Sequence, residues 1–145
     1  MNILFVCTGN TCRSAMAAAL FNKIALEKNL DVRIESAGIF ARDGEPASNE
    51  AVIAMKKYDI DLLGHHAQTI NTELIAKSDL ILTMTKAHKM VLEPAAKDKV
   101  FTLCEYAGLD GDIDDPYGGD VAEYEECAEK LYGALERVAD RLGNN

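Results

Sequence analysis

The segment Ile3-Leu4-Phe5-Val6-Cys7-Thr8-Gly9-Asn10-Thr11-Cys12-Arg13-Ser14 contains an apolar run, a glycine-containing loop and the beginning of an alanine-rich stretch. The apolar run, residues 3–6, predicts a strand that is buried on both faces, as strands of parallel sheets are. From Ser14 onward we expect an amphipathic helix, because apolar residues recur every four positions at Met16, Leu20 and Ile24. Residues 7–13, the Cys7 loop, therefore join the carboxyl end of a buried strand to a helix N-terminus.

Short apolar or alternating segments predict three further strands, at residues 32–35, 80–82 and 100–103. Helical patterns separate the strands, and this alternation favours an α/β fold, a parallel sheet with helices on both faces. In such folds ligands bind beyond the carboxyl ends of the strands, near helix N-termini. The Cys7 loop occupies a position of that kind.

Capping residues and an apolar stripe locate the other helices. Ser48 and Asn71 are expected to be the N-caps of two helices. Residues 36–46 and 110–119 contain Gly and Pro, the latter with several Asp, and are predicted to be loops. A long last helix is predicted from a stripe of side chains at Tyr124, Cys127, Leu131, Leu135, Val138 and Leu142.

Length and charge exclude several classes of protein. The 145 residues fit one domain of common size, here residues 1–145. The chain has 15 Lys and Arg against 24 Asp and Glu, a net charge of −9, without a basic cluster, so we expect no nucleic-acid partner. No apolar run is long enough to span a membrane and no signal-peptide pattern precedes the first strand. We therefore expect a cytoplasmic protein without membrane contact.

The cysteines are expected to be reduced in that compartment, which makes them structural, catalytic or metal-binding. Four are present: Cys7, Cys12, Cys104 and Cys127. The spacing of Cys7 and Cys12 does not match a zinc site, and no second Cys or His pair has such a spacing. We therefore expect no metal and no cofactor.

The Cys7 loop combines a nucleophile with an anion-binding backbone. Its N–H groups can converge on an anion, and Gly9 permits a turn that other residues resist. Arg13 can place its guanidinium on two phosphate oxygens, and the helix dipole, Arg13 and a hydrogen bond from Ser14 favour the thiolate of Cys7. We predict that Cys7 attacks phosphorus and that water hydrolyses the cysteinyl-phosphate. The residues expected to bind the phosphate are Thr8, Gly9, Asn10, Thr11, Cys12 and Ser14.

The loop 110–119 supplies a candidate general acid. Asp115 precedes Pro116, which restricts the backbone of Asp115 to extended geometry. Asp115 can protonate the leaving group and then deprotonate the attacking water. Asp114 is the adjacent rival. The loop lacks the twelve-position ligand pattern of a calcium site, which ends on Glu.

These residues match a known family. The segment Cys7-Thr8-Gly9-Asn10-Thr11-Cys12-Arg13-Ser14, together with Asp115-Pro116-Tyr117-Gly118, resembles the low-molecular-weight protein tyrosine phosphatases, and the resemblance covers essentially the whole chain. It implies a three-layer α/β sandwich with a four-stranded parallel sheet flanked by helices. It also implies a metal-independent, two-step mechanism with Cys7 as nucleophile, Arg13 as phosphate ligand and Asp115 as general acid. Asn10, Ser36 and His65 match the network that holds the loop in shape.

The sequence departs from the tyrosine-specific members of that family at Thr11, where they usually carry Ile or Leu. They also tend to have an aromatic residue after the second strand, where this chain offers only Phe40. Together with Thr85 and His88 after Met84, these features resemble the bacterial protein arginine phosphatase branch.

Thr11 has a physical bearing on the substrate. An aliphatic side chain there would leave guanidinium N–H groups of phosphoarginine unpaired, at about 1–3 kcal/mol per group. A threonine hydroxyl can instead accept a hydrogen bond. We therefore predict a monomeric phosphatase that acts on phosphoarginine residues of proteins, with phosphotyrosine as the alternative leaving group.

Two other functions compete with this prediction. Arsenate reductases of the same superfamily share a similar loop, but they need two further thiols on a segment after the third strand, where this chain has none. Cys104, expected on the fourth strand, and Cys127 are predicted to be buried. A non-catalytic phosphopeptide-binding module would need the anion-binding loop but neither the nucleophile nor the acid.

Cys12 suggests a further hypothesis. It lies in the same tight loop as Cys7, so an oxidised Cys7 can form a disulfide with it that protects the nucleophile from irreversible oxidation. The alternative is that Cys12 only fills a small space in the core.

Overall fold

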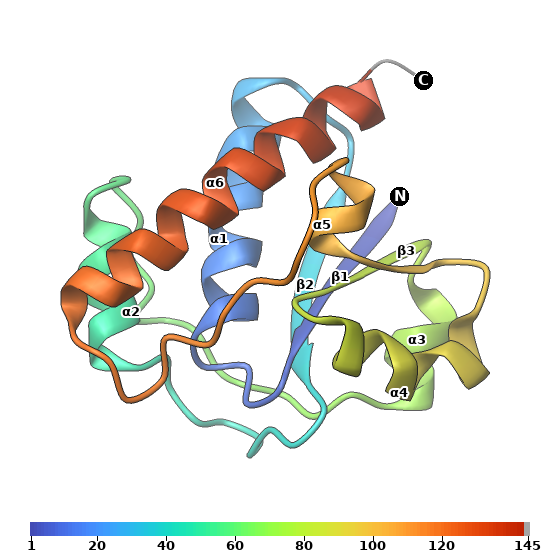
Figure 1. Ribbon diagram of the computed structural model, residues 1–145, viewed down its shortest axis with the longest axis horizontal. Coiled ribbons are helices and arrows are strands. Elements are labelled where there is room, and N and C mark those ends of the chain that lie inside the picture. The colour runs from blue at the N-terminus through green and yellow to red at the C-terminus, as the bar shows by residue number, and fades with distance from the viewer. Residues whose placement is uncertain (144–145) are drawn as a thin grey trace.

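A computed structural model describes residues 1–143 of the chain. Its centre is a four-stranded sheet in the order β2-β1-β3-β4, with all strands parallel and helices on both faces (Figure 1). The strands are β1 (Asn2–Cys7), β2 (Arg33–Gly38), β3 (Leu80–Thr83) and β4 (Val100–Thr102). The predicted fold class and all four predicted strands are confirmed.

The second strand is longer than its sequence pattern indicates. Ser36 and Gly38 were expected in a loop, but they pair in parallel register with Phe5 and Cys7 of β1. Backbone pairing with a buried neighbour therefore extends β2 through residues with little strand propensity. As a result, the end of β2 lies directly beside the end of β1.

Six helices connect and cover the strands of the described chain: α1 (Arg13–Glu27), α2 (Asn49–Lys56), α3 (Thr72–Lys77), α4 (Lys86–Ala96), α5 (Leu103–Tyr106) and α6 (Val121–Gly143). The predicted N-caps are confirmed, since Ser48 accepts from Ala51 N and Asn71 accepts from Leu74 N. The sequence pattern did not identify α4, whose N-cap is Thr85.

Cys104 was expected on the fourth strand and lies instead in α5. The strand stops at Thr102 because this residue begins a capping box with Glu105. The thiol of Cys104 is nevertheless buried, as predicted.

The two faces of the sheet bury separate apolar clusters. Ile3 and Phe5 of β1 pack with α1, α2, α5 and α6, whereas Leu4 and Val6 pack with α3 and α4. The alternation along β1 shows why its apolar run has no polar member: both faces of this strand are covered. The three-layer arrangement is visible in Figure 1, where α1 and α6 lie on one side of the sheet and α3 and α4 on the other.

The strand order places a crevice at the carboxyl end of β1. From β1 the chain crosses to β2 on one side and later returns to β3 on the other, which is the topological switch point at which α/β folds bind ligands. The Cys7 loop follows β1 at this point and leads into α1.

Candidate active site

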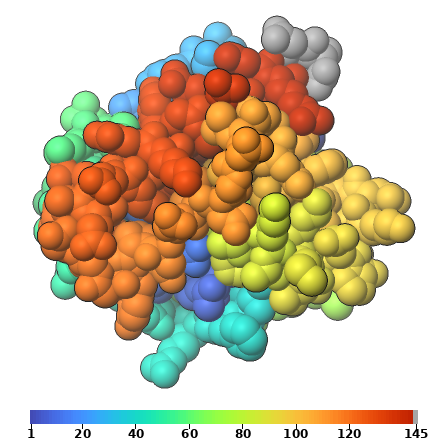
Figure 2. Space-filling view, in the orientation of Figure 1, coloured from blue at the N-terminus to red at the C-terminus, as the bar shows by residue number. Residues whose placement is uncertain are grey.

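A cavity of about 400 Å³ opens above the Cys7 loop. In the space-filling view the blue N-terminal segment is seen at the bottom of a recess between the orange, yellow-green and cyan parts of the chain (Figure 2). The cavity is lined by Cys7, Thr8, Gly9, Asn10, Thr11, Cys12, Arg13, Phe40, Arg42, Glu45, Asp115 and Tyr117. Nearly all the residues proposed from the sequence thus lie around one cavity.

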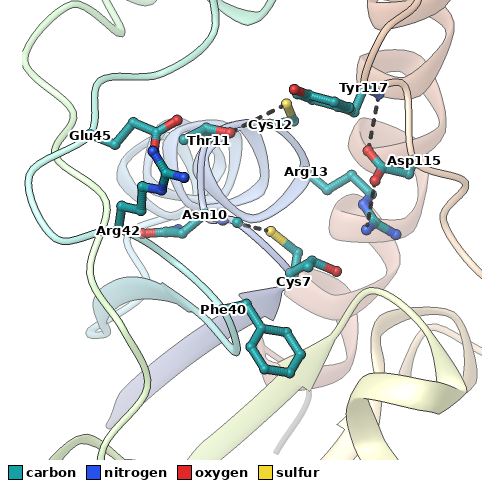
Figure 3. A pocket seen from close by; sticks show the side chains of 12 residues that line it. Cys7, Asn10, Thr11, Cys12, Arg13, Phe40, Arg42, Glu45, Asp115 and Tyr117 are labelled. Carbon is teal, nitrogen blue, oxygen red and sulfur yellow. Dashed lines mark hydrogen bonds and ion pairs between the residues drawn. The ribbon is translucent and has the colours of Figure 1, made fainter.

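Ser14 is the exception, because it lies beneath the loop and is fully buried. Its Oγ is 2.8 Å from the Sγ of Cys7, and the backbone N–H of Asn10 donates to the same sulfur over 3.3 Å. The Ser14 hydroxyl can therefore donate to a Cys7 thiolate without touching a ligand. Cys7 itself is 3% exposed and its side chain points to the centre of the cavity (Figure 3).

Asn10 holds the loop in shape. Its φ is 57°, a left-handed conformation that Asn tolerates better than most residues. Its side chain donates to Ser14 Oγ over 2.8 Å and accepts from Gln68 N over 3.0 Å. The Nε2 of His65 is 2.6 Å from the carbonyl oxygen of Asn10. Ser36 enters this network through its carbonyl, which accepts from the side chain of Gln68.

Arg13 connects the Cys7 loop to residues 110–119, here called the acid loop. Its guanidinium is almost fully buried, and Nη1 donates to the carbonyl of Ile113 over 2.9 Å. Its Nη2 forms an ion pair with Asp115 Oδ2 at 3.4 Å (Figure 3). The arginine is thus held in place by the backbone, and one edge of its guanidinium faces a carboxylate at the cavity.

The geometry distinguishes Asp115 from its neighbour Asp114. The side chain of Asp115 is half-exposed, lines the cavity and accepts from the N–H of Tyr117 over 3.0 Å. Asp114 does not line this cavity; it lines a second cavity, which Asp115 shares, next to side chains of α6. Only Asp115 of this pair is therefore placed to exchange a proton with a ligand above Cys7.

The mouth of the cavity includes residues that the sequence analysis did not single out as site residues. Phe40 and Tyr117 are about four-fifths exposed, and the side chains of Arg42 and Glu45 lie together on the side of Thr11 (Figure 3). All four come from irregular segments, where neither spacing nor periodicity indicates which way a side chain points. The mouth therefore offers two aromatic surfaces, a cation and a second carboxylate.

The other thiols lie outside the cavity, with the exception of Cys12. Burial raises the pKa of Cys104, and burial raises that of Cys127 to about 12. Cys12 lies 3.2 Å from the hydroxyl of Tyr124. Burial, followed by this contact with Cys12, raises the pKa of Tyr124. Arsenate reduction would require two further reactive thiols. Cys104 and Cys127 do not line the cavity, and their raised pKa values make them hard to ionise.

Residues 1–143 contain no group of three or more His, Cys, Asp or Glu side chains arranged to hold a metal ion. Within the same residues, no helix is long and apolar enough to cross a membrane.

Comparison with known proteins identifies relatives over the whole chain. Residues 2–145 match the family model of low molecular weight phosphotyrosine protein phosphatase. A protein-arginine-phosphatase of Bacillus subtilis is 42% identical over 98% of this chain and 97% of the relative. A low molecular weight protein-tyrosine-phosphatase, PtpB of Staphylococcus epidermidis, is 36% identical over 95% of this chain and 96% of the relative.

A solved structure gives the same result at the level of the fold. The YwlE arginine phosphatase, in a C7S mutant with a phosphorylated active site serine, superimposes with a TM-score of 0.96. The sequences are 41% identical, and the alignment covers 100% of this chain and 97% of the other.

Proposed function

Because the chain belongs to the low-molecular-weight phosphotyrosine protein phosphatase family, we propose that it hydrolyses phosphoarginine residues of proteins through a cysteinyl-phosphate on Cys7. The observation that carries this proposal is the convergence of Cys7, Arg13 and Asp115 on one cavity above a loop of backbone N–H groups. We also propose that the protein acts in the cytoplasm, where the thiol of Cys7 stays reduced. We propose further that it acts as a monomer.

In the first step the Cys7 thiolate attacks the phosphorus atom of the bound substrate. The S–P bond forms while the P–N bond to the arginine side chain breaks, and the departing nitrogen takes a proton from Asp115. The N–H groups of the loop and Arg13 stabilise the negative charge on the phosphoryl oxygens. Ser14 and the Asn10 N–H, which contact the sulfur at 2.8 and 3.3 Å, stabilise the thiolate before the attack.

In the second step water hydrolyses the cysteinyl-phosphate. Asp115, now a carboxylate, takes a proton from the water as its oxygen bonds to phosphorus and the S–P bond breaks. The products are inorganic phosphate and the Cys7 thiolate. A phosphate bound to Arg13 would compete with Asp115, whose carboxylate forms an ion pair with the same guanidinium at 3.4 Å.

The relatives support a phosphoryl-enzyme on the residue at the position of Cys7. In the YwlE structure, serine replaces the cysteine of the active site and is itself phosphorylated. The alignment covers the whole of this chain, including the Cys7 loop. A phosphoryl group on Cys7 is the corresponding intermediate for this chain.

Polar groups around the cavity favour phosphoarginine over phosphotyrosine. Glu45 places a carboxylate at the mouth beside Arg42, and a carboxyl oxygen of Asp115 can accept a hydrogen bond from a guanidinium N–H before the acid donates its proton. Thr11 lines the cavity, where its hydroxyl can accept a hydrogen bond from a guanidinium N–H of the substrate. The B. subtilis relative named a protein-arginine-phosphatase supports the same preference.

Phosphotyrosine is the second candidate substrate. Phe40 and Tyr117 are exposed at the mouth and can pack against a phenyl ring. The S. epidermidis relative is named a tyrosine phosphatase. Both observations are compatible with weaker hydrolysis of phosphotyrosine at the same site.

The proposal is tested by hydrolysis of a phosphoarginine peptide with purified protein. Cys7→Ser should abolish turnover and keep phosphate binding, because the loop amides and Arg13 remain. Cys104→Ser is the matched control, since it exchanges a buried sulfur in α5 that does not line the cavity, and it should retain turnover. Absence of turnover in the wild type, with phosphopeptide binding retained, would instead support a binding module.

A further inference from the structure

His88 is buried against the Cys7 loop although it lies 75 positions after the end of that loop, in the first turn of α4 (88 − 13 = 75). Its Nε2 is 2.9 Å from the hydroxyl of Thr8, the second residue of the loop. Its Nδ1 is 3.0 Å from the hydroxyl of Thr85, which also accepts from the backbone N–H of His88 over 3.2 Å. The imidazole therefore bridges the loop to the N-cap of a helix.

The same turn of the chain also holds the acid loop. The N–H of Ile113 donates to the carbonyl of Met84 over 2.9 Å, and the N–H of Lys86 donates to Asp112 Oδ1 over 3.0 Å. The beginning of α4 thus contacts the loop of the nucleophile on one side and the loop of the general acid on the other. Each contact fixes one of the two loops relative to the same short segment.

We propose that His88 is a positioning residue. Its bond to Thr8 fixes the position of the Cys7 loop relative to the acid loop. The inference rests on the proposed function, because it requires Asp115 to protonate a leaving group on phosphorus bound above Cys7. Without the bond from His88, Thr8 would still be held through its carbonyl, which accepts from Phe40 N over 2.9 Å, but no longer from the side of α4. The distance between the leaving group and Asp115 would then vary more. Transition states depend strongly on such alignment.

The charge state of the imidazole fits this role. Burial, and next the positive charge of Arg13, lower the pKa of His88 from 6.5 to about 4, although Asp112 and Asp115 act in the opposite direction. These are the charged groups that face it from α1 and from the acid loop. At neutral pH the ring therefore has one donor and one acceptor nitrogen, which match the two threonine hydroxyls.

The test uses variants that remove one bond at a time. The amide of His88→Asn can reach Thr85 in place of Nδ1 but cannot reach Thr8, whereas the amide of His88→Gln can reach Thr8 in place of Nε2. Thr8→Val removes the same bond from the other partner without changing the shape of the side chain. Leu92→Ala is the control, because it removes a buried side chain of α4 that packs away from the loop.

Each protein is assayed on para-nitrophenyl phosphate and phenyl phosphate, which differ in how much their leaving groups need a proton. His88→Asn should lower kcat/KM about five- to tenfold for phenyl phosphate and less for the nitrophenyl ester. Thr8→Val should lower kcat/KM in the same way, more for phenyl phosphate than for the nitrophenyl ester. The double variant His88→Asn/Thr8→Val should lose no more kcat/KM than either single variant. His88→Gln should recover most of the activity. Leu92→Ala should lower stability and leave the ratio of kcat/KM values on the two esters unchanged.

The outcomes separate this inference from the proposed function. Wild-type protein that hydrolyses neither the two esters nor a phosphoarginine peptide overturns the proposed function and with it the inference. Normal wild-type turnover with a His88→Asn variant that equals the wild type on both esters overturns the inference alone. The inference is also overturned if the fold-losses in kcat/KM of His88→Asn and Thr8→Val multiply in the double variant, because the two residues would then act independently.

Discussion

Gly38→Ala should damage the site although Gly38 is neither a catalytic residue nor strained. A Cβ at this position would lie 2.4 Å from the carbonyl oxygen of Thr8 and 3.0 Å from the backbone N of Asn10, where ordinary contact begins at 3.4 Å. The end of β2 or the Cys7 loop must therefore shift by about 1 Å (3.4 − 2.4). The carbonyl of Thr8 cannot shift freely, because it accepts from Phe40 N over 2.9 Å.

The shift has two measurable consequences. Overpacking of this kind costs about 1–3 kcal/mol of stability. A displacement of about 1 Å between reacting groups lowers the rate by about a hundredfold. We therefore expect kcat/KM of Gly38→Ala to fall by about two orders of magnitude, well beyond what its lower stability explains in a fully folded sample.

The assay compares kcat/KM on para-nitrophenyl phosphate with stability from urea unfolding. Gly133→Ala makes the same chemical change in the exposed face of α6, where a Cβ would meet nothing within 4 Å. This control should gain about 1 kcal/mol of stability and keep full activity, because Ala favours helix over Gly. A Gly38→Ala protein with wild-type kcat/KM would show that the close approach of β2 to the loop has no role in shaping the site.

Three further predictions concern the acid, the pH dependence and oxidation. Asp115→Asn should lower kcat/KM on phosphoarginine peptides by about 10²–10⁴-fold, whereas Asp114→Asn should stay near the wild type; similar losses in both would refute the assignment of the acid. Stability measured by urea unfolding should fall by up to about 3 kcal/mol from pH 6.5 to 4, because the unfolded chain protonates His88 near 6.5 and the folded chain only near 4. His88→Gln should lose less stability than the wild type over that pH range, and a loss equal to that of the wild type would assign the effect to other titrating groups. After peroxide treatment, thiol should restore the wild type but not Cys12→Ser; equal recovery would rule out protection of Cys7 by a disulfide.

Much of the fold follows from local patterns in the sequence. The apolar run of β1 and the stripe of α6 predict their elements because their side chains are buried as the patterns require. Ser48 and Asn71 mark helix starts because their side chains accept from backbone N–H groups. Such features depend on residues close in the sequence, so they can be inferred without knowledge of the fold.

Other features depend on neighbours that are distant in the sequence. The extension of β2 to Gly38 depends on pairing with β1, and the end of β4 depends on the capping box of Thr102. The helix α4 has only three buried residues, and its Pro94 argues against a helix when the sequence is considered alone.

The same limit applies to the site. The chemistry of Cys7, Arg13 and Asp115 can be predicted, because the residue types and the family motifs specify it. The positions of Arg42 and Glu45 depend on the path of an irregular segment, and the bond from His88 to Thr8 joins residues 80 positions apart. No spacing rule connects such residues before the fold is known.

The most direct test of the account compares kcat/KM on matched phosphoarginine and phosphotyrosine peptides for the wild type and Thr11→Ile. The wild type should prefer phosphoarginine. Thr11→Ile should lose activity on phosphoarginine by about tenfold and retain or gain activity on phosphotyrosine, because an aliphatic rim leaves guanidinium N–H groups unpaired and packs on a phenyl ring. The proposed substrate would be contradicted if the wild type prefers phosphotyrosine and Thr11→Ile leaves the ratio of kcat/KM on the two peptides unchanged.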